Sequence, residues 1–502
     1  MEKTVLMNYL TKREETGILL QRIFSNRWNE VFIIDAIKSE KYSYGDFFSM
    51  ILRCREKLDE LELEPNCTIC TIMNNSIQLI ALYFASLTLG IPIISIDPNK
   101  GENEIKEILL STRCKVIFSD SDDQNFPLNS LVFHTFCDNI RLQKNDDVKK
   151  LEIFLKINYN ELFIITYTSG STGKPKGVMH SFNNFVLSSL AFREKFEFND
   201  ENIFYHNLPM SYIGGILNLI ILPLISESKI VIDEKFSITK MKNFWEQPIK
   251  YSVNTFWFIP TILSLLLKID RSNDGVEYSE KNNIIGLVGT ASLQKDLKTN
   301  FQEKYSIPLY ESYALSETFF ITTNFLENDK VESPGRLLDG VDLTFSKDNE
   351  ILIEVPWMFL GYYGLDTKNY FIERKYQTGD LGEFDSEKFL RITGRKKDII
   401  IKGGTNISPK RIEDFINSMN LVDEFIILGI DDEVFGEKIV CMFIAEDKQN
   451  KEFIKIINKK IVDKLGIEYH IDEFLKINEI PKNSNGKIDR IRARKKYQDL
   501  KI

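Results

Sequence analysis

Hydroxyl, glycine and lysine side chains are concentrated in residues 167–178, which read YTSGSTGKPKGV. Glycine lets the backbone turn sharply and approach a ligand closely. Successive backbone N–H groups can form a concave anion site, to which hydroxyls add donors and lysine adds positive charge. The stretch is not a Walker A loop, because Thr168 stands where that motif needs glycine and Pro175 where it needs serine or threonine. We therefore expect a loop that binds a polyphosphate.

Other stretches carry groups that suit the remaining parts of a nucleotide. An aromatic ring can cover a purine, and a carboxylate suits a hard cation that bridges phosphates. A carboxylate can also accept hydrogen bonds from two neighbouring hydroxyls. The stretches are 310–318 (YESYALSET), 376–381 (YQTGDL), 394–409 (GRKKDIIIKGGTNISP) and 481–488 (PKNSNGKI). Two turn-like stretches, 208–215 (LPMSYIGG) and 289–293 (GTASL), complete the set.

Taken in order, these stretches resemble the motifs of the adenylate-forming superfamily over essentially the whole chain. Its members include acyl-CoA synthetases, non-ribosomal peptide adenylation domains and firefly-type luciferases. The loop at 167–178 and the stretches at 376–381, 394–409 and 481–488 are specific matches. The stretch at 310–318 departs at several positions, and those at 208–215 and 289–293 are degenerate. Because chance assembly of these motifs in family order is negligible, the chain is identified as a member of this superfamily.

The resemblance implies a nucleotide site with an assigned role for each matching residue. Lys487 is the implied catalytic lysine, Lys176 offsets phosphate charge, and Glu317 holds Mg²⁺. The residues implied to bind the nucleotide are Thr168, Ser169, Gly170, Ser171, Thr172, Gly173, Lys176, Tyr313, Ser316, Asp380, Arg395 and Lys487. Among them Tyr313 stacks on adenine and Asp380 binds the ribose hydroxyls.

The same resemblance implies a hinge, a path for a thiol arm and an acyl pocket. Lys397 occupies the hinge position, and Gly403 and Gly404 admit the pantetheine arm. The candidate pocket residues are Tyr212, Gly214, Trp257, Gly289, Ser292 and Phe319. Ser211 and Tyr212 stand where the family often has Phe and His. The acid itself therefore stays undetermined.

The elements that must position these residues alternate along the first three hundred residues. Apolar runs predict strands at 162–165, 255–259 and 283–288, and helical spacing predicts helices at 182–196 and near 214–224. Strand–helix–strand order predicts parallel sheets flanked by helices. Short strands and turns from about residue 333 predict a β-rich subdomain, and the last hundred residues predict a small, mobile α+β domain. We expect an α/β protein with an N-terminal AMP-binding domain over 1–394 and a C-terminal domain over 395–502.

Composition excludes several other classes of protein. A chain of 502 residues with 43% hydrophobic and 27% charged residues predicts a globular protein of two or more domains. The net charge of −9 argues against general nucleic-acid binding, and six cysteines do not make a disulfide scaffold. The apolar run at 213–225 is shorter than the ~20 residues that span a bilayer. The first residues, MEKT, lack a signal-peptide pattern, so we expect a cytoplasmic protein without stable membrane insertion.

The implied activity is that of an AMP-forming acid–thiol ligase. ATP and Mg²⁺ convert a carboxylic acid to an acyl-adenylate with release of pyrophosphate, and the acyl group then passes to coenzyme A. Loading of an acyl or aminoacyl group onto the phosphopantetheine of a carrier protein is the alternative. The lack of an acid near Ser211 and Tyr212 favours a plain carboxylate over an amino acid. A non-catalytic adenylate-binding protein is a third reading, which the intact lysines and acids of the motifs disfavour.

Overall fold

The computed structural model describes most of the chain, in two compact units. The described residues are 14–63, 67–112, 114, 116–120, 131–133, 148–168, 175–290, 293–326, 328–419, 424–444, 451–482 and 488–501. The first unit comprises Met1–Asp342 and Glu354–Phe371, and the second comprises Leu343–Ile353 and Ile372–Ile502. This division assigns 343–353 and 372–394 to the C-terminal unit, whereas the sequence-based boundary at 394/395, which stays a prediction, assigns them to the N-terminal domain.

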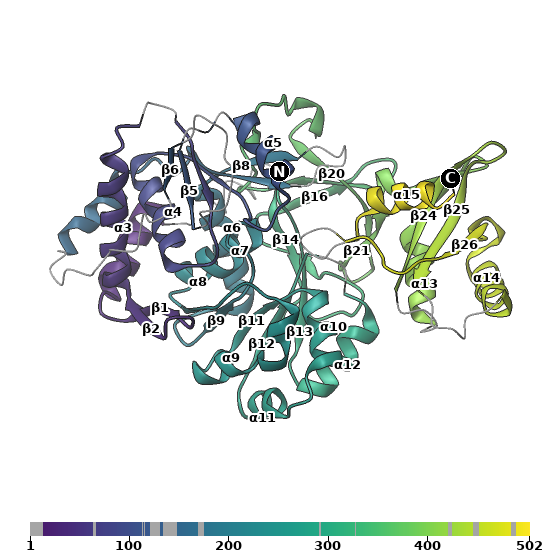
Figure 1. The fold of residues 1–502 in the computed structure, drawn as a ribbon, viewed down its shortest axis with the longest axis horizontal. Helices are drawn as coiled ribbons and strands as arrows, with labels where there is room; N and C mark the ends of the chain where they lie inside the picture. Colours follow the sequence, from purple (N-terminus) through teal and green to yellow (C-terminus); the bar gives the residue numbers. More distant parts are fainter. Residues whose placement is uncertain are drawn as a thin grey trace. The chain divides into compact units, whose positions relative to one another are not determined.

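A nine-stranded sheet forms much of the first unit (Figure 1), in the order β15-β14-β13-β12-β11-β9-β10-β1-β2. Neighbouring strands from β13 to β1 run parallel, and β2, β14 and β15 are antiparallel additions at the two edges. Because parallel strands end on one edge of a sheet, the residues that follow β9, β11 and β12 are brought together there. The strands are β1 (Val31–Asp35), β2 (Glu40–Ser43), β9 (Ile203–His206), β10 (Lys229–Ile232), β11 (Thr255–Phe258), β12 (Ile285–Val288), β13 (Leu309–Leu315), β14 (Phe319–Thr323) and β15 (Arg336–Leu337).

A seven-stranded sheet, in the order β18-β8-β7-β4-β3-β5-β6, carries the predicted phosphate loop. Its β7, β4, β3, β5 and β6 are parallel, whereas β8 and β18 are antiparallel additions. The predicted strand at 162–165 is confirmed as part of β7, and β8 was not expected. The strands are β3 (Ile69–Ile72), β4 (Ile93–Ser95), β5 (Val116–Ser119), β6 (Leu131–Phe133), β7 (Leu162–Thr168), β8 (Lys176–Ser181) and β18 (Gly361–Tyr362).

Helix α6 (Phe182–Phe196) lies between the two sheets, since it contacts β14 of the first and β7 and β8 of the second. The Ser181 hydroxyl caps it by accepting from the backbone N–H of Asn184. The other helical segments of this unit are α2 (Thr16–Asn26), α3 (Tyr44–Asp59), α4 (Ile77–Leu89), α5 (Glu102–Thr112), η1 (Val148–Lys156), η3 (Ile238–Asn243), α9 (Glu246–Lys250), α10 (Pro260–Ile269), α11 (Asp274–Lys281), α12 (Lys295–Tyr305) and η4 (Lys368–Tyr370).

The helix predicted near 214–224 is confirmed but has three parts. These are α7 (Ile213–Ile216), a π-helical turn η2 (Leu217–Ile221) and α8 (Leu222–Ile225). At its start, a Cβ on Gly215 would lie 2.0 Å from the carbonyl oxygen of Pro209. Only glycine therefore lets the loop at 208–211 pack this closely on α7.

The second unit contains two five-stranded sheets. One has the order β16-β17-β20-β19 with β21 paired to β20, and the other has β23-β22-β25-β24 with β26 paired to β25. The second sheet is covered on both faces: α13 and α14 supply Ile412 and Ile457 to one core, and α15 supplies Tyr497 to the other (Figure 1). The elements are β16 (Asp342–Phe345), β17 (Glu350–Glu354), β19 (Phe371–Ile372), β20 (Lys375–Phe384), β21 (Leu390–Arg395), η5 (Lys396–Asp398), β22 (Ile400–Lys402), β23 (Thr405–Ile407), α13 (Pro409–Ser418), β24 (Glu424–Asp432), β25 (Gly436–Ile444), α14 (Lys451–Leu465), η6 (Ile467–Tyr469), β26 (Glu473–Lys476) and α15 (Arg490–Asp499).

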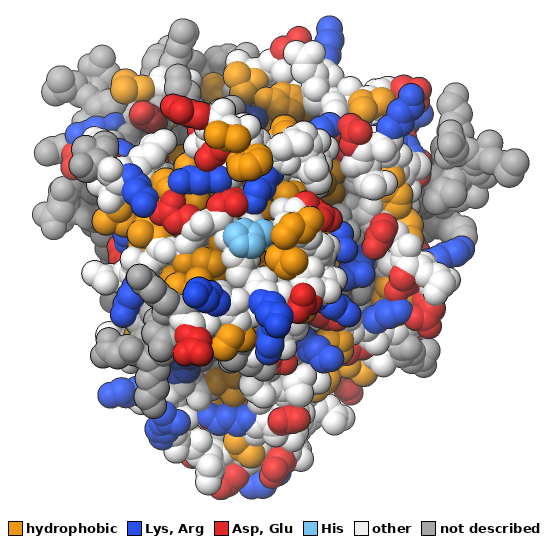
Figure 2. Space-filling model, turned by 90° about the vertical axis from the view of Figure 1, so that its right-hand side faces the viewer, with side chains coloured by type: hydrophobic (Ala, Val, Ile, Leu, Met, Phe, Trp, Pro, Cys, Tyr) orange, Lys and Arg blue, Asp and Glu red, His pale blue; other side chains and the backbone are white. Residues whose placement is uncertain are grey.

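The predicted α/β fold class is confirmed, with parallel sheets flanked by helices and a β-rich region after residue 341. On the face drawn in Figure 2, basic and acidic side chains are interspersed without a continuous basic stripe. In the part of the chain that the structure describes, no helix has the length and apolar composition needed to cross a membrane.

Candidate active site

The predicted phosphate loop connects β7 to β8. These strands pair antiparallel, and Thr168 lies opposite Lys176 at the base of the loop. The strand pair therefore fixes where the loop starts and where it ends. The predicted nucleotide-binding residues Ser169, Gly170, Ser171, Thr172 and Gly173 lie outside the described residues.

Lys176 is held by two tyrosines, Tyr362 and Tyr370. Its Nζ donates to the Tyr370 hydroxyl at 2.9 Å and lies 4.6 Å from the centre of that ring. The ring of Tyr362 is 5.1 Å away. Aromatic faces attract an ammonium group without neutralising it. The arrangement orients the Lys176 charge and leaves it able to bind an anion.

Tyr362 also contacts Glu317, the predicted metal ligand. The hydroxyl of Tyr362 donates to Oε1 of Glu317 at 2.6 Å, and the Glu317 carbonyl accepts from the backbone N–H of Phe359 at 2.9 Å. The side chains of Lys176 and Glu317 therefore lie close together in the first unit, because Tyr362 contacts both. No three metal-binding side chains gather among the described residues. A single carboxylate fits Mg²⁺, which is usually held by one or two carboxylates together with substrate phosphates.

The turn that carries Ser316 is tethered to a buried histidine. Burial lowers the pKa of His180 to about 3, so its imidazole is neutral at physiological pH. Its Nε2 is 2.7 Å from the Ser316 carbonyl oxygen and its Nδ1 is 3.2 Å from the amide nitrogen of Asn184. This network requires the proton on Nε2, which donates to Ser316, while Nδ1 accepts from Asn184. The predicted stacking residue Tyr313 lies on β13 and is nearly buried.

The predicted acyl-pocket residues come from α7 and from the ends of β11 and β12. Tyr212 precedes α7, and its ring packs on Gly214: a Cβ on Gly214 would lie 2.7 Å from the Tyr212 ring. Trp257 pairs with Leu287 across β11 and β12, and Gly289 follows β12. Phe319 instead stacks on His180, with ring centres 3.9 Å apart. The remaining predicted pocket residue, Ser292, lies outside the described part of the chain.

The predicted ribose ligand lies in the second unit, where β20 and β21 pair. Asp380 is 3% exposed, and its Oδ1 is 2.8 Å from Nε of Arg395. Glu350 accepts from the Gly379 backbone N–H at 3.0 Å and from Lys396 Nζ at 2.8 Å. That hydrogen bond raises the pKa of Lys396. The structure therefore brings Asp380 and Arg395 together and fixes the turn before Asp380 through Glu350.

The predicted hinge and thiol-arm residues also lie in the second unit. Lys397 is in η5, and its side chain is exposed. Gly403 and Gly404 form the turn between β22 and β23 with φ of +57° and +81°. Glycine adopts this left-handed conformation readily, which is why it suits a tight hairpin. Lys487, the predicted catalytic lysine, lies outside the described residues.

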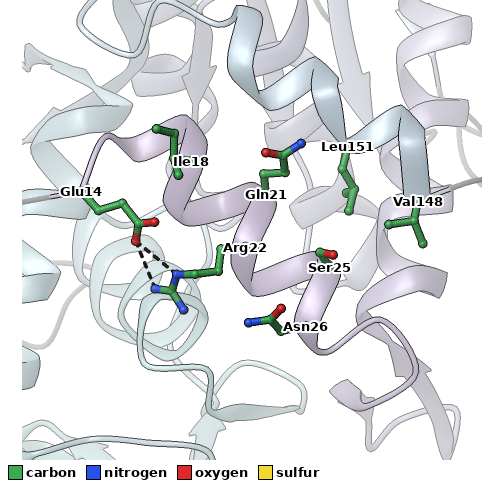
Figure 3. A pocket seen from close by; sticks show the side chains of 8 residues that line it. All are labelled: Glu14, Ile18, Gln21, Arg22, Ser25, Asn26, Val148 and Leu151. Atoms are coloured by element: carbon green, nitrogen blue, oxygen red, sulfur yellow. Dashed lines mark hydrogen bonds and ion pairs between the residues drawn. The ribbon is translucent and has the colours of Figure 1, made fainter.

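The structure also shows a surface hollow between α2 and η1 (Figure 3). Arg22 lies on its wall and pairs with Glu14 through two hydrogen bonds of 3.2 Å. None of its lining residues is a predicted site residue. We assign it no part in nucleotide binding.

The model of the AMP-binding enzyme family matches residues 21–363 of this chain, which include Lys176, Glu317 and Tyr362. The chain belongs to this family. The predicted membership of the adenylate-forming superfamily is thereby confirmed, as is the prediction of an enzyme.

Known proteins resemble this AMP-binding enzyme over most of its length. The 2-succinylbenzoate–CoA ligase of Bacillus pumilus is 24% identical over 91% of this chain and 94% of its own length. ATP-bound MatB from Rhodopseudomonas palustris has the same fold, with a TM-score of 0.82 and 21% identity over 96% of this chain and 99% of its own. O-succinylbenzoate coenzyme A synthetase (MenE) from Bacillus subtilis, in complex with ATP and magnesium ion, has a TM-score of 0.79. It is 20% identical over 94% of this chain and 98% of its own length.

Several groups in the site of this AMP-binding enzyme were not expected from the sequence. His180, Tyr362, Tyr370 and Glu350 belong to none of the predicted site motifs. The site residues that they hold are 29 to 194 positions away in the chain, so no local pattern marks them. The sequence signal that could have drawn attention to Tyr362 is its place in the aromatic run at 357–363 (WMFLGYY).

Removing one hydroxyl tests whether Tyr362 positions Glu317 in this AMP-binding enzyme. In Tyr362→Phe the ring stays near Lys176, but the 2.6 Å hydrogen bond to Glu317 is lost. Because a neutral hydrogen bond to a charged group contributes about 1.5–3 kcal/mol, we expect the Mg²⁺ concentration for half-maximal pyrophosphate exchange to rise by roughly 10-fold. Tyr363→Phe, on the next residue, is the matched control and should leave the Mg²⁺ dependence unchanged. An unchanged Mg²⁺ dependence in Tyr362→Phe would refute the positioning role.

Buried histidines predict a dependence of stability on pH. Burial lowers the pKa of both His180 and His206 to about 3, whereas unfolded histidine titrates near pH 6.5. Between those values the unfolded chain binds more protons, so the free energy of unfolding falls as pH falls from about 6.5 towards 3. Each histidine should remove roughly 2 kcal/mol between pH 7 and pH 5.

The variant His206→Leu removes one titrating ring that has no hydrogen-bond partner among the described residues. We expect its loss of stability between pH 7 and pH 5, measured by urea unfolding, to be about 2 kcal/mol smaller than that of the wild type. Equal losses in His206→Leu and wild type would contradict the assignment.

Proposed function

We propose that this AMP-binding enzyme is an ATP-dependent acid–thiol ligase that converts a carboxylic acid to its coenzyme A thioester. The observation that carries the proposal is the contact of Tyr362 with both Lys176 and Glu317 beside the strand pair that bears the phosphate loop. A cation and a metal-binding carboxylate at one place suit a polyphosphate with its Mg²⁺. The CoA-ligase names of relatives such as the Bacillus pumilus protein support the same activity.

Each part of ATP would be bound by a different set of the predicted motif residues. The backbone and hydroxyls of 168–173 and the Lys176 ammonium would contact the phosphates, and Glu317 would hold Mg²⁺, which would offset phosphate charge. Tyr313 would cover adenine and Ser316 would contact phosphate. Asp380 would accept from the ribose hydroxyls, and Arg395 would contact the nucleotide. The Arg395 guanidinium, 2.8 Å from the buried Asp380 carboxylate, orients this acceptor.

The reaction has two steps. A carboxylate oxygen of the acid attacks the α-phosphorus of ATP, and the bond to the bridging oxygen breaks with release of pyrophosphate. A thiolate then attacks the acyl carbon, and AMP leaves with the bonding electron pair. The first step brings an anion to a polyanion, so positioning and charge stabilisation supply most of the rate. Lys176 orients the pyrophosphate end, and Lys487 is proposed to bridge the carboxylate and the α-phosphate.

The second step is proposed to use a different orientation of the C-terminal domain, residues 395–502. Rotation at Lys397 would withdraw Lys487 and present the turn at Gly403 and Gly404 to the thiol arm. A few residues that absorb a large φ/ψ change are sufficient for such a hinge. The exposed position of Lys397 in a short turn between β21 and β22 supports this role.

Loading of a carrier protein is the alternative acceptor reaction. It uses the same acyl-adenylate and the same thiol chemistry, so the described site supports it equally. The names of the relatives favour coenzyme A. A cytoplasmic location is also proposed, supported by the low cysteine content, six in 502 residues, which is not that of a disulfide scaffold.

Pyrophosphate exchange across a library of carboxylic acids of increasing chain length tests the first step. We expect acid-dependent exchange that requires Mg²⁺. With the active acids, AMP release is then measured with coenzyme A and with a panel of carrier proteins. Faster AMP release with coenzyme A supports the ligase proposal, and release only with a carrier supports the alternative. No exchange with any acid would overturn both and favour a non-catalytic adenylate-binding protein.

A further inference from the structure

Four residues gather at the carboxyl ends of strands in the nine-stranded sheet, on one of its faces. Tyr205 pairs with Phe256, so the following residues, His206 and Trp257, are neighbours on β9 and β11. Because side chains alternate along a strand, both project to the face opposite Phe256. Gly289 and Ser312 lie on the same face, at the end of β12 and on β13. Ligands of parallel sheets bind at this edge.

Trp257 presents a buried donor that has no acceptor. Its side chain is 3% exposed, and its indole N–H has no hydrogen-bond partner among the described residues. A Cβ on Gly289 would lie 3.3 Å from this nitrogen and 3.6 Å from the Ser312 hydroxyl oxygen. Because residue 289 is glycine, no side chain of that residue stands between the indole N–H and the hydroxyl. Buried donors are nearly always paired in native structures, so this N–H is available to donate a hydrogen bond to a ligand.

His206 adds a second unpaired group beside it. It is fully buried, and neither of its ring nitrogens has a partner in the described part of the chain. Burial lowers its pKa to about 3, so the ring is neutral at physiological pH. It therefore offers one donor and one acceptor, without charge.

Aromatic rings pack on Trp257 and form an apolar wall beside these four residues. The ring centres of Phe192 and Phe320 lie 5.6 Å and 5.5 Å from that of Trp257. Phe192 belongs to α6 and Phe320 to β14, so the wall is made by the helix between the sheets and an edge strand. A small number of polar groups on an apolar wall is typical of a site that selects a small molecule.

We propose that this niche, formed by His206, Trp257, Gly289 and Ser312, binds an uncharged hydrogen-bond acceptor of the acid substrate, a carbonyl or hydroxyl oxygen distant from the reacting carboxylate. The inference rests on the proposed function and names the substrate class for the same site. Trp257 Nε1 donates to this oxygen, and Gly289 leaves room for it. A second carboxylate is disfavoured, because an indole, a hydroxyl and a neutral imidazole would leave its charge buried without a counter-charge.

Pairs of acids that differ at one position test the niche. Each pair has equal chain length, and one member carries a ketone or hydroxyl oxygen where the other carries only hydrogen. For at least one position of the oxygen, we expect wild-type kcat/KM in pyrophosphate exchange to favour the oxygen-bearing acid by about 10-fold, as one buried neutral hydrogen bond predicts. Trp257→Phe, which keeps a ring and removes the N–H, should lose this preference through slower reaction of the oxygen-bearing acid alone.

Two further variants make the outcome decisive. Gly289→Ala fills the niche and should also remove the preference. Trp245→Phe is the matched control: its indole N–H is bonded to Asp270 at 3.1 Å and its ring packs on Phe256, which belongs to the opposite face. It should keep the wild-type preference. A wild type that prefers the hydrogen-bearing member of every pair, or a Trp257→Phe variant that retains the preference, would overturn the inference.

Failure of the proposed function gives a different result. If no acid supports exchange, the niche is tested by calorimetric binding of the same pairs of acids without ATP. Tighter binding of the oxygen-bearing member to wild type but not to Trp257→Phe supports the niche. Equal binding of both members overturns it.

Discussion

Lys487→Ala is expected to abolish measurable pyrophosphate exchange while the protein remains folded. Loss of one preorganised charge-stabilising group typically costs ~100- to 1,000-fold in rate. Lys487 lies in the Gly-Lys-Ile frame of 486–488, and the proposed mechanism gives it the contact that joins the carboxylate to the α-phosphate. Exchange is measured with saturating acid and ATP, and thermal unfolding confirms the fold.

The neighbouring lysine supplies the control for Lys487. Lys482 forms an exposed ion pair with Glu424 at 2.9 Å, with 42% of its side chain accessible. Such pairs contribute little, so Lys482→Ala should keep near-normal exchange and stability. Near-normal exchange in Lys487→Ala itself would refute the assignment of the catalytic lysine.

Asp380→Ala is expected to lower kcat/KM for ATP by roughly 100-fold or more, because a charged acceptor of two hydroxyl hydrogen bonds is removed. Arg395, which pairs with Asp380, has a half-exposed side chain, so water can replace the lost partner and the cost in stability stays modest. The sharper readout is nucleotide discrimination. Wild type should strongly prefer ATP to its 2′,3′-dideoxy analogue, and Asp380→Ala should treat the two almost alike.

Glu383 lies on the same strand, β20, and is exposed. Glu383→Ala removes a carboxylate without touching the proposed ribose site, so it should keep wild-type nucleotide preference. If Asp380→Ala still prefers ATP to the dideoxy analogue as strongly as wild type does, the ribose contact lies elsewhere.

The order of strands and helices could be predicted from the sequence where local patterns were strong. The apolar run at 162–165, the helix at 182–196 and the strands near 255–259 and 283–288 are present as β7, α6, β11 and β12. The antiparallel β8 was missed because residues 176–181 contain Lys176, Gly177 and His180 and show no clear alternation. Pairing with β7 makes this segment a strand, and pairing is a long-range interaction that a local pattern does not contain.

For a similar reason, the sequence predicted the motif residues of the candidate site but not the residues that hold them in place. Lys176, Glu317, Asp380 and Arg395 lie in motifs whose residue types match their chemistry, so the sequence was sufficient to select them. The groups that hold them were missed, because Tyr362, Glu350 and His180 meet their partners only after the chain has folded. The assignment of Phe319 to the acyl pocket stays a prediction, and its neighbour Phe320 packs on Trp257.

By itself the sequence determined the class of chemistry, since glycines, hydroxyls, lysines and acids in a fixed order suit a nucleotide and its metal. It did not determine which of the other polar side chains take part. Only the tertiary structure decided that one phenol orients both Lys176 and Glu317. It also decided that Trp257 and His206 are buried on one face of the sheet, with no hydrogen-bond partner for their ring nitrogens among the residues that the structure describes. The physical reason is that hydrogen bonding and burial depend on neighbours distant in the chain, whereas side-chain type and spacing are local properties.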